Sequence, residues 1–318
     1  VTGTITATVS ITDRSGVVLA LLALEDRPLT PGDQVAIDTT TLLDGEHAVI
    51  VEAEDLSPRH NRTTAKAIFR SHNAPPSLAV QVDPQVIGQG HVGVVRVSAD
   101  EPFTLTGNLD GRPLPFAKDQ DSFWTILAFG ADQEPGDHHL QLRAVDAAGN
   151  EVEKTVPVTV TRVAYPTESI DMPADRLPLL SSEVVEQESA RLSEIFAAFT
   201  PEKLWRGLFI TPTVGSISSA FGQRRSYNGG PFGSPHGGVD LAADQGAPVL
   251  AANDGRVALA EQLKVRGNAV VIDHGLGLFT VYCHLSDVAV TPGQTVKKGD
   301  LVGHVGSTGL STGPHLHW

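Results

Sequence analysis

The sequence has a single cysteine, Cys283, among its 318 residues. An intrachain disulfide is therefore excluded, and the domains must be held together by burial, hydrogen bonds or bound metal. No apolar run approaches the ~20 residues that cross a bilayer, so we expect no transmembrane segment in this chain. The chain opens on Val1, without a basic segment followed by an apolar core. A signal peptide or anchor would have been removed or would lie upstream.

Positive charge is also scarce, with 23 Lys and Arg against 37 Asp and Glu and a net charge of −14. No Lys/Arg cluster alternates with aromatic residues, so nucleic acid is not expected as a partner. The acidic excess lies before residue 207, because residues 207–318 contain seven basic and seven acidic residues. An acidic surface of this kind favours solubility.

Residues 1–163 have the pattern of an all-β protein, with short β-branched runs between clusters of Pro, Gly, Asn and Asp. The same region contains an internal repeat. Residues 45–55 (GEHAVIVEAED) resemble residues 136–146 (GDHHLQLRAVD), and residues 26–29 (DRPL) resemble residues 111–114 (GRPL). Two related copies of a β module are therefore expected in tandem.

We predict that the two copies are immunoglobulin-like β-sandwiches, over residues 1–74 and 75–163, similar to the modules common in bacterial surface proteins. Neither copy carries a catalytic group of residues. His47, His138 and His139 begin strands after turns, and we interpret them as half-exposed strand residues. Contact of these modules with the cell wall or with other surface proteins is left open.

Residues 164–206 are predicted to be a linker with one helix. Residues 164–178 are polar and interrupted by proline, which is typical of a connector. Ser182 is placed to cap a helix that Pro201 ends. We expect this helix to pack as a brace on the C-terminal domain, through an apolar stripe of Val185, Leu192, Ile195, Phe196 and Phe199.

Residues 207–318 change to Gly-rich turns between short Val, Ile and Leu strands, which predicts a compact, mostly antiparallel β domain. His236 and Asp240 lie four residues apart in this domain, with two glycines between them that permit a sharp turn. His315 and His317 flank Leu316, so on a strand both imidazoles face one side and Leu316 packs behind them. Imidazole nitrogen and carboxylate oxygen are the usual ligands of a hydrolytic zinc ion.

These residues stand in an ordered set of motifs. His-x3-Asp (residues 236–240) is followed by Tyr-x-His-Leu-Ser (282–286) and by Thr-Gly-x-Ser-Thr-Gly-Pro-His-Leu-His (308–317). The set resembles that of the lysostaphin or LytM-type zinc metalloendopeptidases, which cut peptide bonds in bacterial peptidoglycan. Ser-Ala-Phe-Gly-Gln-Arg (219–224) and Val-Thr-Pro-Gly-Gln-Thr-Val-Lys-Lys-Gly-Asp (290–300) add to the resemblance, which covers roughly residues 207–318.

The resemblance implies one zinc ion per chain, bound by His236, Asp240 and His317. It also implies that His284 and His315 are the catalytic histidines, which orient or deprotonate the zinc-bound water and stabilise the oxyanion. The implied partner is a peptidoglycan peptide, and the implied location is extracytoplasmic: periplasmic, cell-surface or secreted. The scissile bond is left open between a D-amino-acid cross-link and a glycine bridge.

The remaining residues of the domain receive structural interpretations. His274 and His304 belong to no motif and are expected to lie outside the site. Cys283 precedes His284, so strand alternation directs it to the opposite face as buried packing. The walls of the substrate groove are expected in the Gly-rich residues 227–233 and 306–312.

The sequence also has features of two other functions. The strands at residues 249–257 and 290–305 also resemble the hammerhead strands of biotinyl or lipoyl carrier domains, but no lysine stands at a suitable hairpin tip. A non-catalytic or autoinhibited wall-binding protein of the same fold is the second alternative. All five motif positions are filled, which favours an enzyme. Because the family's domain normally continues past His-Leu-His-Trp, we expect a truncated fragment in which the strand at His317 is poorly supported.

Overall fold

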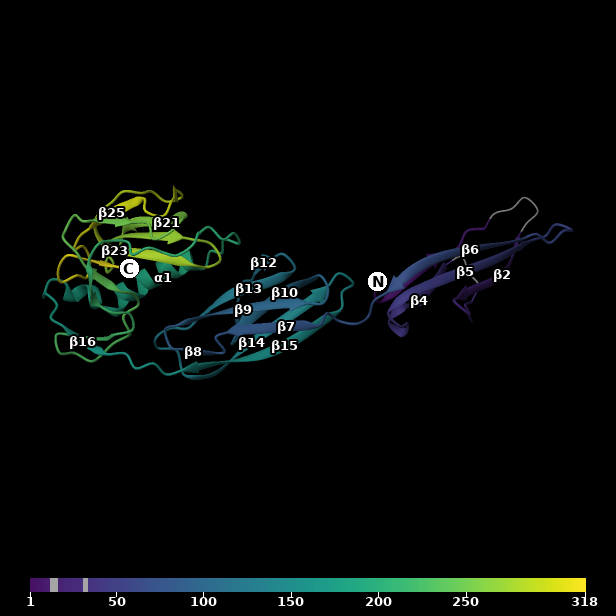
Figure 1. Cartoon of the computed structure of the whole chain (residues 1–318), viewed down its shortest axis with the longest axis horizontal. Helices are drawn as coiled ribbons and strands as arrows, with labels where there is room; N and C mark the ends of the chain where they lie inside the picture. The colour runs from purple at the N-terminus through teal and green to yellow at the C-terminus, as the bar shows by residue number, and fades with distance from the viewer. Residues whose placement is uncertain (12–16, 31–33) are drawn as a thin grey trace. The chain divides into compact units, whose positions relative to one another are not determined.

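The computed structural model describes residues 1–11, 17–30 and 34–318 (Figure 1). Within them the chain is mainly β, with strands β1–β26, the helix α1 and two short 3-10 helices. The predicted fold class is therefore confirmed. The chain forms two compact units, which are described separately. Unit 1 comprises Val1–Ala79, Ser98–Thr106 and Leu142–Lys154, and unit 2 comprises Val80–Val97, Gly107–Gln141 and Thr155–Trp318.

The first repeat lies in unit 1. A four-stranded antiparallel sheet has the order β3-β2-β5-β6, and β1 pairs with β4 in a separate two-stranded sheet. Both sheets contribute to one apolar core, built around Leu22, Ile37 and Val49. The strands are β1 (Thr4–Thr8), β2 (Val17–Leu24), β3 (Arg27–Pro28), β4 (Gln34–Asp38), β5 (Gly45–Asp55) and β6 (Arg62–Ser71), with a 3-10 helix at Thr39–Thr41.

The second repeat forms two further sheets, whose strands contribute to both units. Their orders are β11-β10-β14-β15-β8 and β12-β13-β9-β7. The strands are β7 (Leu78–Asp83), β8 (Val86–Gly88), β9 (Val92–Ala99), β10 (Phe103–Leu109), β11 (Arg112–Pro113), β12 (Ala117–Asp119), β13 (Ser122–Ala128), β14 (Gly136–Asp146) and β15 (Glu151–Thr161).

The internal repeat of the sequence corresponds to matching elements of the structure. β5 and β14 are both 11 residues long, and β3 and β11 are both two-residue Arg-Pro strands. Each of the long strands is followed by a turn in which an aspartate accepts hydrogen bonds from an asparagine, Asp55 from Asn61 and Asp146 from Asn150. The assignment of both copies to the immunoglobulin-like class, with boundaries at residues 74 and 163, remains a prediction.

Two of the three repeat histidines differ from the prediction. His47 and His138 are buried rather than half-exposed, whereas His139 is exposed. Each buried imidazole lies between a carboxylate at Nδ1 and a main-chain carbonyl at Nε2. Hydrogen bonds to these two oxygens stabilise the protonated ring, and the pKa of each of the two histidines is raised. The partners are Glu25 and Leu43 for His47, and Asp110 and Glu134 for His138.

The C-terminal part of unit 2 is a β domain with one covering helix. Its sheet runs β17-β19-β26-β23-β22-β21-β24, with β20 and β25 paired beside it, and all of these pairs are antiparallel as predicted. The strands are β17 (Ser216–Ser219), β18 (Arg224–Tyr227), β19 (Asp240–Ala242), β20 (Pro248–Leu250), β21 (Gly255–Gln262), β22 (Asn268–Asp273), β23 (Phe279–Val288), β24 (Thr295–Val296), β25 (Leu301–Val305) and β26 (His315–His317).

The helix α1 (Ser182–Phe196) packs on this β domain through Leu192 and Ile195 of the predicted stripe (Figure 1). The other three stripe residues, Val185, Phe196 and Phe199, are exposed, and the helix ends at Phe196, before Pro201. Leu192 is buried against Leu259, Val271 and Cys283. The helix begins one residue earlier than predicted, because Ser181 rather than Ser182 is the N-cap. At 15 residues α1 is too short to cross a bilayer, and no other described helix has the length or apolarity to do so.

The predicted connector is wrong over part of its length. Within residues 164–178, the segment Thr167–Ile170 forms β16, which pairs in parallel with β18 of the C-terminal domain. A 3-10 helix at Leu177–Leu180 then leads into α1. The polar sequence of β16 has no apolar alternation, because only part of one face of this edge strand is covered, and the strand was therefore missed.

Candidate metal centre

Three strands bring the C-terminal motif residues together. β26 lies between β19 and β23, and its pairing sets Asp240 opposite His317 and His317 opposite Cys283. His315 and His317 share one face of β26, and Leu316 between them is fully buried in the core, as predicted. The expectation that the strand at His317 is poorly supported is wrong, because β26 is hydrogen-bonded on both sides.

Three of the five residues form a compact group of ligand atoms. His236 Nε2 lies 2.9 Å from His317 Nδ1 and 3.1 Å from Asp240 Oδ1, and His317 Nδ1 lies 2.8 Å from Asp240 Oδ1. His236 and Asp240 are buried, and the exposed fraction of His317 is small. Three lone-pair atoms this close together repel one another unless protons or a cation lie between them.

The outer contacts of His236 fix which nitrogen faces this group. His236 Nδ1 lies 3.0 Å from the carbonyl of Ala220, to which it donates, so Nε2 carries the lone pair. A second constraint is steric, since a Cβ at Gly238 would lie 2.9 Å from His317 Nε2 and 2.6 Å from the carbonyl of Trp318. The glycine at this position lets the His317 ring approach the loop that carries His236.

Asp240 is held in its ionised form. Burial alone would raise the pKa of the Asp240 carboxyl, but the imidazoles of His236 and His317 beside it hold that pKa far below its usual range. Its second oxygen, Oδ2, accepts a hydrogen bond from Arg225 Nη2. The donor set of two imidazole nitrogens and one carboxylate oxygen fits a hydrolytic zinc ion, which takes three protein ligands and keeps one position open.

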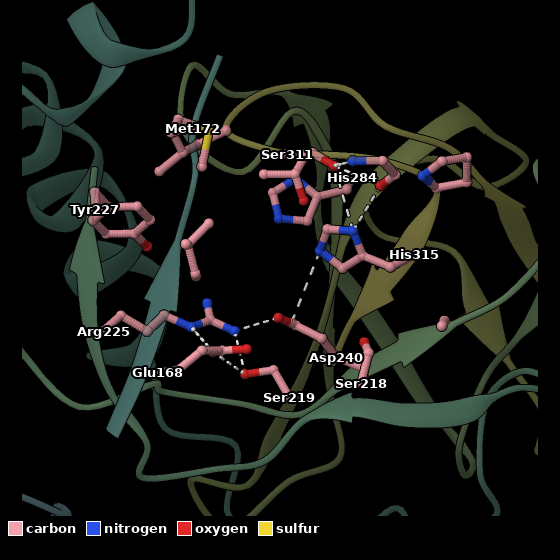
Figure 2. Close-up of a pocket in the computed structure, with 16 residues that line it drawn as sticks. Glu168, Met172, Ser218, Ser219, Arg225, Tyr227, Asp240, His284, Ser311 and His315 are labelled. Atoms are coloured by element: carbon pink, nitrogen blue, oxygen red, sulfur yellow. Dashed lines mark hydrogen bonds and ion pairs between the residues drawn. The ribbon is translucent and has the colours of Figure 1, made fainter. Parts of the chain in front are cut away.

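His284 and His315 lie beside the metal-ligand group. Their ring centroids are 4.8 Å apart, and His315 Nε2 is 3.9 Å from Asp240 Oδ1. His284 Nδ1 donates to the carbonyl of Thr308 at 2.8 Å, and His315 Nδ1 donates to that of Gly313 at 2.8 Å. In both imidazoles Nε2 therefore carries the lone pair, and Figure 2 shows the two rings beside each other at the pocket.

The backbone at His284 has an unusual conformation. Its φ is +62°, in the left-handed region that a side chain rarely adopts, and its N–H donates to the carbonyl of Arg266 at 2.8 Å. Burial, followed by the neighbouring His315, lowers the pKa of His284 to about 3. His284 is therefore neutral at pH 7, with a lone pair at Nε2.

The metal-ligand group lies between two pockets. One, of about 330 Å³, is lined by Asp240, His284 and His315, and Figure 2 shows Glu168 and Arg225 at its opposite side. The other, of about 780 Å³, is lined by His236, His284 and His317 together with apolar side chains of α1. An extended chain could thus approach from both sides. The predicted walls contribute Tyr227, Gly233, Leu310, Ser311 and Thr312.

The other histidines and the cysteine are placed as expected. His274 is fully buried, with its nitrogens 2.7 Å from the carbonyl of Asp254 and 2.7 Å from the hydroxyl of Thr280. His304 pairs with a nearby aspartate on the neighbouring strand. Cys283 faces the core under α1, where burial raises the pKa of its thiol to about 12. It is neither ligand nor nucleophile.

Sequence reasoning missed the residues that support the site from outside the motifs. Glu168 binds Arg225, and the buried Glu188 of α1 binds Arg266. Arg225 directly follows the quoted Ser-Ala-Phe-Gly-Gln-Arg motif, which could have drawn attention to it. The two glutamates stand in segments without a motif, and only the folded chain brings them to the site.

The part of the chain that carries the metal-ligand group is similar to known peptidases. Residues 234–318 match the model of Peptidase family M23. Peptidoglycan DD-endopeptidase ShyA of Vibrio cholerae is 29% identical over 223 residues, which are 69% of this chain and 48% of that protein. DD-carboxypeptidase/endopeptidase Mpg of Neisseria meningitidis is 48% identical over 83 residues, 26% of this chain and 19% of that protein. The chain therefore spans about half or less of the length of these relatives.

A solved structure agrees over a longer part of the chain. A protein of Pseudomonas aeruginosa described as a peptidase M23 has 26% sequence identity and a TM-score of 0.52, and the match covers 72% of this chain and 87% of that one. This coverage is wider than residues 234–318, so the likeness includes segments outside the family match.

Proposed function

We propose that the M23 peptidase domain of this chain is a zinc-dependent endopeptidase that hydrolyses peptide bonds in bacterial peptidoglycan. The observation that carries this proposal is the arrangement of five residues from three separate motifs. His236, Asp240 and His317 offer three ligand atoms within 4.8 Å of one another. His284 and His315 lie beside them with one nitrogen each left for chemistry.

In this proposal His236 Nε2, Asp240 Oδ1 and His317 Nδ1 hold the zinc ion. A zinc ion bound there would lower the pKa of a water molecule towards ~7 and polarise the scissile carbonyl. The chain has no glutamate base in the motif set, so the imidazoles take up that work. His284 is neutral at pH 7 and accepts a proton at Nε2, because its Nδ1–H is already donated to Thr308.

His315 lies beside His284 and completes the site. Its Nδ1–H is donated to the carbonyl of Gly313, so the ring orientation is fixed by the chain that leads into β26. When it is also protonated at Nε2, the imidazolium of His315 would donate a hydrogen bond to the oxyanion that forms when the carbonyl is attacked. A fixed donor is worth more than a mobile one because no reorganisation is needed during the reaction.

We infer a peptidoglycan stem peptide or cross-bridge as the substrate and an extracytoplasmic location for the protein. ShyA and Mpg are named for DD-endopeptidase activity, and this makes a bond between D-amino acids the first candidate. An extended peptide would pass through both pockets, with its scissile bond at the metal-ligand group between them. The zinc ion is expected at one per chain.

The test is digestion of purified peptidoglycan by the full chain, with the released muropeptides separated and identified. We expect cleavage of cross-links, loss of cleavage in a chelator, and recovery when Zn²⁺ is restored. His236→Ala, which removes one ligand, is expected to lose both the metal and the activity. Cleavage that persists in chelator would overturn the zinc mechanism. Binding to peptidoglycan without cleavage, at full zinc occupancy, would favour the wall-binding alternative.

A further inference from the structure

The strand β16 lies outside the residues matched by the family model, yet it borders the metal centre. β16 pairs with β18 in parallel, and the register places Glu168 opposite Arg225. Both side chains line the pocket that contains Asp240, and Figure 2 shows them facing it. The segment before the domain therefore contributes a carboxylate close to a proposed zinc ligand.

Glu168 is anchored by two donors. Its Oε2 accepts hydrogen bonds from the hydroxyl of Ser219 at 2.6 Å and from Arg225 Nε at 3.1 Å. The side chains of Glu168 and Arg225 are only 25% and 15% exposed, so the ion pair is screened less than one on the surface. The guanidinium is held in one orientation as a result.

That orientation determines how Asp240 is presented. Arg225 Nη2 donates to Asp240 Oδ2 and also to the hydroxyl of Ser219 at 2.7 Å. With Oδ2 engaged, Oδ1 is the oxygen that faces His236 and His317. The contact thus selects one carboxylate oxygen as the ligand and fixes the angle of the carboxylate.

Glu168 also balances the positive charge of Arg225 near the metal centre. Arg225 is a permanent cation beside a position that must accept a dication, so by itself it would weaken metal binding. The carboxylate of Glu168 offsets that charge on the side away from the metal. Without it, the guanidinium would be free to neutralise Asp240 alone.

We propose that Glu168 is a positioning residue of the metal centre, which holds Arg225 so that Asp240 presents Oδ1 to the metal. The proposal rests on the metal site of the proposed function and is independent of which bond is cleaved. Glu168 touches neither metal nor substrate peptide in this role. Its effect is expected in metal affinity, because it acts through a ligand.

The experiment measures the Zn²⁺ affinity of the full chain by competition with a chromophoric chelator. Glu168→Gln keeps the shape and an acceptor but removes the charge, and we expect about tenfold weaker binding. Glu168→Ala removes both, and we expect a loss approaching ~100-fold. Glu183→Gln, at an exposed position of α1, is the matched control and should bind Zn²⁺ as the unmodified chain does.

Each result decides between the alternatives. Affinities of both Glu168 variants within twofold of the control would overturn the proposal, as would a chain that binds no Zn²⁺ at all. If the Glu168→Ala protein does not fold, the Zn²⁺ affinity of Glu168→Gln, whose side chain keeps the shape of glutamate, decides the question. If the unmodified chain binds Zn²⁺ but cleaves no peptidoglycan, the proposed function fails while the role of Glu168 is still judged from the affinities.

Discussion

Replacing Glu188 by alanine should loosen the loop that supports His284. Glu188 lies on α1 with a side chain only 4% exposed, and its carboxylate accepts three hydrogen bonds from the loop between β21 and β22. The donors are Val265 N at 2.7 Å, Arg266 N at 3.2 Å and Arg266 Nη1 at 2.7 Å. The carbonyl of Arg266 in turn accepts the N–H of His284.

The size of the effect depends on the hydrogen-bond donors that lose their acceptor in Glu188→Ala. Two backbone N–H groups lose a charged acceptor, and such hydrogen bonds contribute about 1.5–3 kcal/mol each. The Arg266 side chain is 33% exposed and can turn to water, which limits the further cost. We therefore expect the free energy of local opening of this loop to fall by about 3 kcal/mol, which corresponds to about a 100-fold larger open population.

Amide hydrogen exchange of the full chain measures that population directly. In Glu188→Ala we expect the amides of Val265, Arg266 and His284 to exchange about 100-fold faster, within the limit set by global unfolding. Peptidoglycan cleavage should fall, while Zn²⁺ affinity should stay within a few fold, because His284 is not among the three proposed ligands. The control is Glu186→Ala, an exposed glutamate of the same helix. Equal exchange at these amides in both variants would refute the link between α1 and His284.

Two other substitutions test the site and the repeat. Gly238→Ala should weaken Zn²⁺ binding at least tenfold, because its Cβ would lie 2.9 Å from His317 Nε2, whereas Gly237→Ala, with nothing within 4 Å, should bind normally in the same chelator competition. Asp110→Asn should lower the melting temperature most at about pH 5.5 and least at about pH 8.5. Burial opposes the raised pKa of His138, but the hydrogen bonds with Asp110 and Glu134 and the nearby carboxylate charges together outweigh it. The stabilisation is therefore present below about pH 6.5 and lost as the pH rises through the folded pKa. A difference in melting temperature that grows towards pH 8.5 would contradict this assignment.

The sequence predicted best where the pattern is local. The His-Leu-His segment requires only strand alternation to place two imidazoles on one face and Leu316 in the core, and the structure has this arrangement. Helical spacing likewise predicts the packing of Leu192 and Ile195 of α1, whereas Val185, Phe196 and Phe199 of the same predicted stripe are exposed. The repeat was visible because two copies of one strand and one turn retained their spacing.

What the sequence did not predict depends on contacts between distant segments. β16 has no apolar periodicity, and its pairing with β18 joins positions 167–170 to positions 224–227. His47 and His138 are buried because each finds a carboxylate and a carbonyl at its two nitrogens, which a strand pattern does not reveal. The left-handed backbone of His284 also has no signal in its neighbours, since no glycine marks the position.

The parallel pairing of β16 with β18 means that the metal centre depends on residues that precede the family-matched segment 234–318. Glu168 and Arg225 are 57 positions apart in the chain but act on one ligand. A recombination that joined residues 234–318 to a foreign N-terminal segment would carry Asp240 without Glu168 and Arg225. We therefore expect these two positions to be exchanged together or to vary together among related chains, so that the transferable unit begins upstream of β16.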